Sequence, residues 1–243
     1  MNGSKADIIA RLQREILPLQ GYKPLQNKQA QGFGLAEINA SFPNKTFPLG
    51  VVHEFCCDSK EGLAATGGFI SGILSTLNKN GGASIWIASS QHIFPPALRS
   101  YGLDPERFLF VLMKREKDIF WAMNEALQCS GLNAVIAELK SLSFTASRRF
   151  QLAVEESGVT GFIIRDNPGN LNTTASITRW KIKPLASDTS DDLPGVGFPR
   201  WQVDLQKVRN GIPGSWTVEW AHGQFNLLSS EKKHLHMLQK KTG

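Results

Sequence analysis

The segment from Cys57 to Ala64 has the spacing of a phosphate-binding loop between a strand and a helix. Such a loop, G-x-x-x-x-G-K-[ST], surrounds phosphate with glycine amides, a Lys and a hydroxyl that binds Mg²⁺. Here Cys57 stands at the first Gly position and Gly62 at the second, but Leu63 replaces the Lys and Ala64 replaces the hydroxyl residue. Because phosphoryl transfer depends on that cation and that metal ligand, the sequence predicts a degenerate nucleotide site with no catalytic residue and no bound cofactor.

Three charged residues near this segment have candidate roles. Glu138 ends the apolar run Ala134–Glu138, where an ATPase of this layout places an acid, and Lys60 lies inside the loop. One hypothesis is an ATPase with a non-standard loop that uses Lys60 and Glu138 with ATP and Mg²⁺. The alternative is structural, with a strand-end carboxylate hydrogen-bonded to the neighbouring loop and a solvated Lys. Glu54, near the start of the segment, could position water as a base in an active relative, and here the alternative is that it pairs with a basic residue.

Five basic side chains form a second candidate site, for single-stranded DNA or a partner protein. Arg148 and Arg149 lie in a segment with helical spacing, while Arg179, Lys181 and Lys183 alternate along one face of an expected strand. Basic groups in such positions can contact nucleic-acid phosphates. The alternative is that these outer faces are charged for solubility. The net charge of +6 adds long-range attraction for polyanions without defining a site.

The sequence has no spacing typical of a metal site or a disulfide framework. The histidines are not spaced with the cysteines as metal ligands are, and His234 and His236 lie in a basic tail. Three cysteines, with Cys56 and Cys57 adjacent, favour buried thiols and a reducing compartment. The pattern predicts neither a signal peptide nor a membrane-spanning run. We therefore expect a cytoplasmic protein with no metal and no membrane partner.

Strands and helices alternate through the middle of the chain. Apolar runs predict strands at 51–57, 83–88, 108–113, 134–138 and 161–165. Helical spacing falls between them at 62–78, 118–131 and 145–157. This alternation predicts βαβ units and an α/β fold, with a mainly parallel sheet flanked by helices. Period-2 alternation at 177–183, 201–205 and 216–220 indicates an antiparallel meander at the C-terminal end, its tryptophans facing inward.

Composition divides the chain into four parts. Residues 1–20 are expected to contain a short amphipathic helix, Lys5–Leu19, and residues 21–48, rich in Gln, Asn, Gly and Pro, are expected to form a connection. The core is expected at 49–228, followed by a basic, frayed tail at 229–243. The N-terminal helix either folds back on its own domain or docks on another protomer or partner.

Several spaced motifs carry a resemblance to a known family. They are Leu49-Gly50 before His53-Glu54-Phe55, Gly102-Leu103-Asp104-Pro105-Glu106-Arg107, Ser147-Arg148-Arg149-Phe150-Gln151-Leu152-Ala153, Thr178-Arg179-Trp180 and Pro199-Arg200-Trp201. The strand-loop-helix segment, the acid-ending strand and the meander resemble the RecA-like ATPase core. The motifs, from about Leu49 to Trp220, resemble one branch of it, the ImuA family.

This resemblance implies a RecA-like accessory protein in error-prone translesion DNA synthesis during the SOS response. It would act without ATPase activity, in a complex with ImuB, a Y-family polymerase relative, and a replicative-type polymerase. Protein contacts are expected at the N-terminal helix and the tail after Glu231, and self-association stays open. The cell-division inhibitor SulA belongs to the same wider group, so a SulA-like role is an alternative.

Overall fold

One mixed sheet forms the frame of the molecule. The computed structural model describes residues 35–43, 45–77, 82–166, 169, 171–187 and 197–231. Within these residues, nine strands form a sheet in the order β3-β2-β4-β5-β1-β6-β7-β8-β9. Their bounds are β1 Val52–Cys57, β2 Ala83–Ala88, β3 Phe108–Leu112, β4 Leu132–Leu139, β5 Thr160–Asp166, β6 Thr178–Leu185, β7 Arg200–Val208, β8 Gly214–Ala221 and β9 Gln224–Glu231.

The sheet has a parallel part and an antiparallel part, as the sequence predicts. Strands β3, β2, β4, β5, β1 and β6 pair in parallel. Strands β7, β8 and β9 extend the sheet from β6 as an antiparallel meander. The helices described are α2 Ala36–Asn39, α3 Lys60–Leu77, α4 Glu116–Leu127 and α5 Phe144–Ser157, with 3₁₀ helices η2 Pro95–Tyr101 and η3 Pro105–Arg107.

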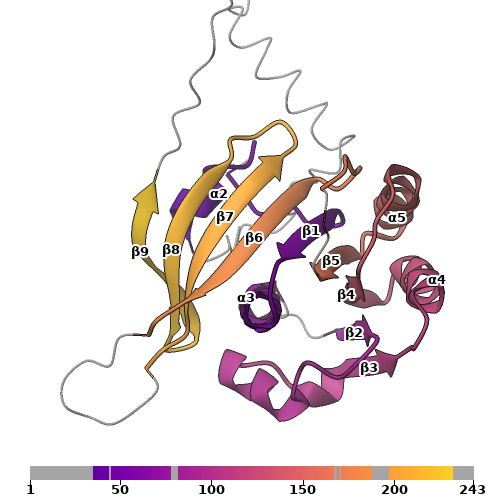
Figure 1. Cartoon of the computed structure of the whole chain (residues 1–243), viewed down its shortest axis with the longest axis horizontal. Helices are drawn as coiled ribbons and strands as arrows, with labels where there is room; N and C mark the ends of the chain where they lie inside the picture. The colour runs from indigo at the N-terminus through magenta and orange to yellow at the C-terminus, as the bar shows by residue number, and fades with distance from the viewer. Residues whose placement is uncertain are drawn as a thin grey trace, which may run out of the picture.

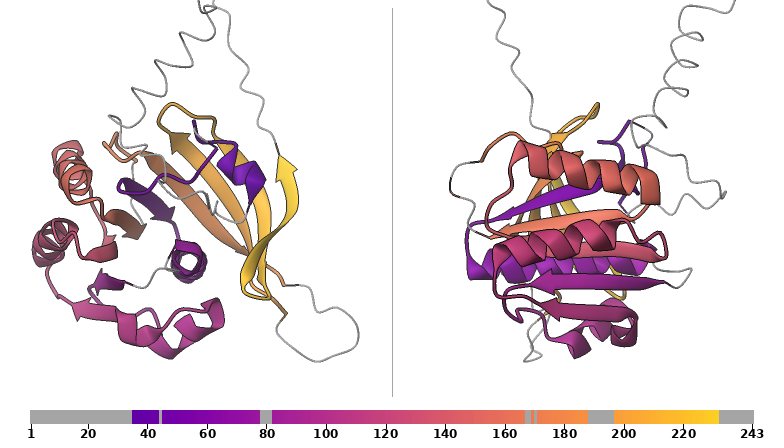
Figure 2. Two further views of the ribbon diagram at one scale, coloured as in Figure 1. Left: turned by 180° about the vertical axis from the view of Figure 1, so that it is seen from behind. Right: turned by 90° about the vertical axis from the view of Figure 1, so that its right-hand side faces the viewer.

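Helices cover the parallel part of the sheet on both faces. Figure 1 shows α3 inside the curve of the sheet and α4 and α5 outside it, and Figure 2 shows the same layers from two further sides. Strand β1 is therefore buried at every position, whereas β6 alternates between buried and partly exposed residues over its first half. The carboxyl ends of the parallel strands lie at one edge of the sheet, and loop residues there can meet.

Helix α3 packs closely on the sheet. Its inward residues Phe69, Ile70 and Ile73 are fully buried. Gly72 lies so near the meander that an added Cβ would stand 2.5 Å from the ring of Phe225. A Gly in a helix interior costs about 1 kcal/mol relative to Ala, so the close approach of helix and strand explains its presence. This packing joins the two parts of the sheet into one core.

Three local features differ from the sequence predictions. Strand β9 was not predicted, because in Gln224–Glu231 the alternation of polar and apolar residues is weak. Helix α4 spans Glu116–Leu127 rather than the expected 118–131, and the Asp118 carboxylate accepts hydrogen bonds from Arg115 at the N-cap position. The expected connection at 21–48 contains α2.

Packing explains the position of α2. Leu35, Ile38, Phe42 and Phe47 are all buried in the core beside Trp180, so this segment belongs to the body of the fold. The predicted N-terminal helix Lys5–Leu19 and the tail beyond Glu231 lie outside the described residues.

Candidate functional site

The connection between β1 and α3 is short. Strand β1 runs to Cys57, α3 begins at Lys60, and only Asp58 and Ser59 lie between them. Ser59 satisfies the first amides of the helix: its Oγ accepts from the Gly62 amide at 3.0 Å and its carbonyl accepts from the Leu63 amide at 2.9 Å. Hydrogen bonds within the chain thus occupy amides that a phosphate-binding loop would direct at its ligand.

The two residues at the Lys and hydroxyl positions of the phosphate-loop pattern lie on α3. Leu63 is buried in the core between helix and sheet, whereas Ala64 is exposed. Lys60 and Glu61 are exposed in the first turn, and hydrogen bonds from its own amide and from Ser59 lower the pKa of the Glu61 carboxyl. A carboxylate here interacts favourably with the N-terminus of the helix and would repel a phosphate bound at the same place.

Glu138 is the last residue but one of β4 and lies on the face covered by α3, where it takes part in two hydrogen bonds. Trp86 Nε1 donates to its Oε1 at 2.9 Å, and His92 Nδ1 lies 2.8 Å from its Oε2. His92 belongs to the loop that follows β2. The structure therefore has, at this position, a strand-end carboxylate that is hydrogen-bonded to a neighbouring loop.

Glu54 is fully buried at the centre of β1, on the opposite face of the sheet from Glu138. Its Oε1 accepts from Arg165 at 3.0 Å, and its Oε2 accepts from Arg179 at 3.0 Å and from the Thr174 hydroxyl at 2.6 Å. The register of the sheet causes this arrangement, because Glu54 pairs with Arg179 across β1 and β6 and Arg165 lies on adjacent β5. The alternative in which Glu54 pairs with a basic residue is confirmed.

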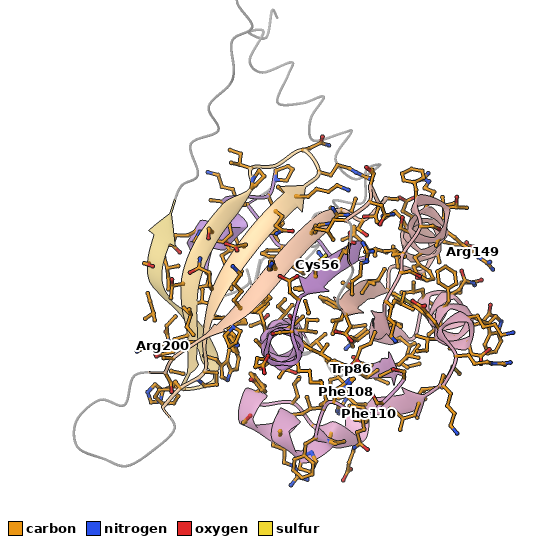
Figure 3. The ribbon with its side chains drawn as sticks, in the orientation of Figure 1. Cys56, Trp86, Phe108, Phe110, Arg149 and Arg200 are labelled. Atoms are coloured by element: carbon orange, nitrogen blue, oxygen red, sulfur yellow. The ribbon has the colours of Figure 1, made fainter. Side chains whose placement is uncertain are left out.

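The five basic candidate residues do not form one surface. Arg148 and Arg149 are exposed on α5, and Figure 3 shows Arg149 on the outer side of that helix. On β6, Arg179 is mostly buried against Glu54, which corrects its predicted place on an exposed strand face. Lys181 forms an ion pair with Asp58, and Lys183 is exposed.

The adjacent thiols at the end of β1 are buried. Burial raises the pKa of Cys56 to about 12 and that of Cys57 to about 11, so neither is a thiolate near neutral pH. The Cys57 sulfur lies 3.2 Å from the Thr66 hydroxyl on α3. Cys129, after α4, is exposed. In the part of the chain that the structure describes, no three His, Cys, Asp or Glu side chains gather as metal ligands would.

A cavity of about 240 Å³ opens beside Glu138, at the carboxyl ends of β2, β3 and β4. It is lined by Trp86, Ala88, Ser90, Gln91, His92, Ile93, Phe110, Leu112 and Glu138. Figure 3 labels Trp86 and Phe110, which are register partners on β2 and β3. Sequence reasoning did not single out Ser90 or His92. The available signal was their place directly after a buried strand, but the strand order that brings them to Glu138 is not readable from the sequence.

Comparison with known proteins defines the class of the fold. No family model matches the chain. The RadB recombinase is similar in structure, with a TM-score of 0.51 and 11% identity over 74% of this chain and 91% of that protein. A KaiC-like protein from Pyrococcus horikoshii OT3 has a TM-score of 0.52 and 11% identity over 82% of this chain and 98% of its own. Together with the strand order, these similarities define a RecA-like fold.

Sequence comparison identifies the family within this class. Protein ImuA of Caulobacter vibrioides, in strains NA1000 / CB15N and ATCC 19089 / CIP 103742 / CB 15, is 32% identical over 220 residues. The match covers 83% of this chain and 90% of the relative. The chain belongs to the ImuA family. Over the described residues, the structure has no helix both long and apolar enough to cross a bilayer.

Proposed function

We propose that this protein is a cytoplasmic accessory factor in error-prone translesion DNA synthesis during the SOS response. It acts by contacts with an ImuB-like relative of the Y-family polymerases and with a replicative-type polymerase, without hydrolysing nucleotide. Membership of the ImuA family is the single observation that carries this proposal. The same observation favours it over a SulA-like role in cell division.

The geometry between β1 and α3 supports action without ATP. Leu63, at the position of the phosphate-binding Lys, contributes to the core instead. Asp58 is paired with Lys181, and the exposed Glu61 adds negative charge at the start of α3. Glu138, the candidate second acid, is engaged by Trp86 and His92. A triphosphate with Mg²⁺ would meet acidic side chains here and no fixed cation in the usual place.

Nucleotide titration tests this part of the proposal. The full-length protein is mixed with a fluorescent ATP analogue and Mg²⁺, with and without single-stranded DNA, and phosphate release is followed. We expect no binding and no turnover. Turnover stimulated by DNA and abolished by Lys60→Ala, but kept in the exposed control Lys117→Ala, would establish the ATPase alternative instead.

Partner binding is proposed to reside in the terminal segments, Lys5–Leu19 and the basic tail. Both differ from the core in composition, one amphipathic and one basic, which suits docking on a partner. Deleting residues 1–20 and, separately, residues 232–243 is expected to weaken retention of an ImuB-like partner in at least one case. If both truncated proteins retain that partner as well as the full chain does, the contacts lie on the core.

Single-stranded DNA is a second candidate ligand, favoured by the exposed pair Arg148 and Arg149. Replacing both with Ala should weaken binding of a fluorescent oligonucleotide and reduce its dependence on salt. The Lys117→Ala variant on α4 is the control. If the wild-type protein, the double variant and Lys117→Ala bind the oligonucleotide equally well, this pair is not the DNA contact.

A further inference from the structure

Four side chains at the carboxyl edge of the sheet form one chain of hydrogen bonds. Trp86 Nε1 donates to Glu138 Oε1 at 2.9 Å, Glu138 Oε2 lies 2.8 Å from His92 Nδ1, and His92 Nε2 lies 3.0 Å from Ser90 Oγ. The two acceptor oxygens of the carboxylate thus have one partner each. The exposed end of the chain is a hydroxyl.

The direction of each proton follows from these partners. An indole N–H can only donate, and an ionised carboxylate can only accept, so His92 must carry its proton on Nδ1 to bond Glu138. In the neutral imidazole the other ring nitrogen, Nε2, then bears a lone pair. Ser90 Oγ therefore donates its proton to His92 Nε2. A catalytic triad has the same order of groups. Its hydroxyl is the nucleophile, its imidazole is the general base, and its carboxylate holds the imidazole in the required tautomer.

Exposure to solvent increases along this series of hydrogen bonds, from Glu138 to Ser90, as a nucleophile that must reach its substrate requires. The Glu138 side chain is 6% exposed and is held by Trp86, so the carboxylate cannot rotate freely. His92 is 41% exposed, and Ser90 lies at the surface where a substrate can reach it. We propose that Ser90, His92 and Glu138 form a nucleophilic triad that reacts with small carboxylic esters.

The cavity beside the hydroxyl indicates the class of ester. Its walls are largely apolar, with Trp86 from β2, Ile93 from the loop that follows β2, and Phe110 and Leu112 from β3. A volume of about 240 Å³ suits a short hydrocarbon acyl group and not a drug-sized ligand. Three lining residues have a side-chain N–H donor, and those of Trp86 and His92 are already hydrogen-bonded, so we assign Gln91 to the oxygen anion that forms during the reaction.

The proposed ester hydrolysis requires no cofactor. Ser90 Oγ bonds to the ester carbonyl carbon while its proton passes to His92 Nε2. The bond from that carbon to the alcohol oxygen then breaks, and the proton moves from His92 to the departing alcohol. Water attacks the acyl-Ser90, giving a proton to His92 that returns to Ser90 Oγ as the carboxylic acid leaves. Glu138 keeps its charge throughout and stabilises the imidazolium. This activity goes beyond the proposed accessory function and does not depend on it.

Covalent labelling tests the nucleophile directly. Full-length protein is treated with a fluorophosphonate probe, and the modified residue is located by peptide mass spectrometry. We expect labelling at Ser90 and none at Ser100, whose hydroxyl donates to the Ala97 carbonyl and, among the described residues, has no hydrogen bond to an imidazole. Ser90→Ala should abolish the labelling, and His92→Gln should slow it about 100-fold or more.

Glu138→Gln separates a triad from a structural hydrogen bond. The amide can still accept from Trp86 and can donate to His92 Nδ1, which shifts the imidazole proton to Nε2. The chain of hydrogen bonds then survives with its direction reversed, and His92 can no longer accept the proton of Ser90. Labelling should slow about 100-fold or more while thermal unfolding changes little. Labelling at another residue, or at Ser90 with an unchanged rate in His92→Gln and Glu138→Gln, would overturn the triad.

Ester turnover tests the substrate class. Release of p-nitrophenol from p-nitrophenyl butyrate should show a burst equal to the protein concentration, lost in Ser90→Ala and reduced in Gln91→Ala. Triad-dependent labelling without any p-nitrophenol release would overturn the assignment to carboxylic esters while keeping the nucleophile.

Discussion

Two buried carboxylates, Glu54 and Glu138, lie on neighbouring parts of the same sheet and have opposite surroundings. Glu54 is enclosed by two Arg side chains and a Thr hydroxyl, all largely buried. The partners of Glu138 are Trp86, which carries no charge, and His92, which opens to solvent. One carboxylate is held inside a closed ionic network, and the other ends a chain of hydrogen bonds that reaches the surface.

The two hydrogen-bond networks differ in what they can do. Around Glu54 the bonds continue into the segment 171–177, since Arg179 also donates to the Asn172 carbonyl and Lys207 donates to that of Thr174. The Ala175 amide donates to Ser147 on α5. The segment 171–177 is thereby fixed between α5 and the sheet. A closed network of this kind stabilises the fold, whereas an open one leaves a reactive group accessible.

The largest effect is expected for Glu54→Gln. The variant leaves Arg165 and Arg179 buried without their counter-charge, and losing one partner of a buried ion pair typically costs about 3 to 5 kcal/mol. Urea unfolding followed by circular dichroism measures the change in the free energy of unfolding. Glu219→Gln, which breaks a pair with Arg200 on the meander, is the control with a smaller expected loss. Equal losses in the two variants would contradict the special place given to Glu54.

The next effect concerns His53, which precedes Glu54 and faces the other side of the sheet. Burial lowers the pKa of His53 in the folded protein to about 3, from an ordinary 6.5. Below pH 6.5 the unfolded chain therefore binds a proton that the folded protein does not, and stability falls as the pH falls toward 3. The slope approaches about 1.4 kcal/mol per pH unit.

A non-titrating variant isolates this contribution. In His53→Gln the amide can replace the hydrogen bonds to Thr178 and Pro48, but it takes up no proton. Between pH 6.5 and 5 the wild-type protein should lose about 2 kcal/mol more than the variant in urea unfolding. Parallel pH profiles would mean that His53 is not the acid-sensitive group.

The sequence predicts the parallel part of the fold well. Continuous apolar runs predict β1 to β5 to within two residues at each end, and the alternation in β6, β7 and β8 indicates the meander. These patterns are local and strong. The segment around α2 was missed because its buried residues, Leu35, Ile38 and Phe42, lie in a stretch too short for helical periodicity to be visible.

The candidate site was less predictable, because it depends on which strands are neighbours. Arg179 alternates with buried residues and so looked exposed, but the segment 171–177 covers that face and Glu54 lies beside it. His92 and Glu138 are 46 residues apart and meet only through the strand order. Residue spacing shows that a carboxylate ends a strand, and tertiary structure decides its partner.

Glu138→Gln tests whether Glu138 contributes less than Glu54 to the free energy of unfolding. Both substitutions exchange a buried carboxylate for an amide, but only Glu54 neutralises buried cations. Because the amide at 138 can keep both hydrogen bonds, we expect a loss of about 1 kcal/mol or less in urea unfolding. A loss as large as that of Glu54→Gln would show that the Glu138 chain is also a main stabilising element of the fold.

The smallest effect is expected for Lys181→Met, which has a matched partner two residues earlier on β6. Lys181 and Arg179 lie on the same face, and each pairs with an acid from the β1 region, Asp58 or Glu54. Asp58 is 60% exposed, whereas Glu54 is fully buried. Water screens the outer pair, so Lys181→Met should change the free energy of unfolding by less than about 1 kcal/mol. Arg179→Met leaves Glu54 with one Arg in a dry site and should cost several times more. Urea midpoints of the two variants, measured side by side at pH 7.5, decide the matter: equal shifts would mean that burial does not distinguish these ion pairs.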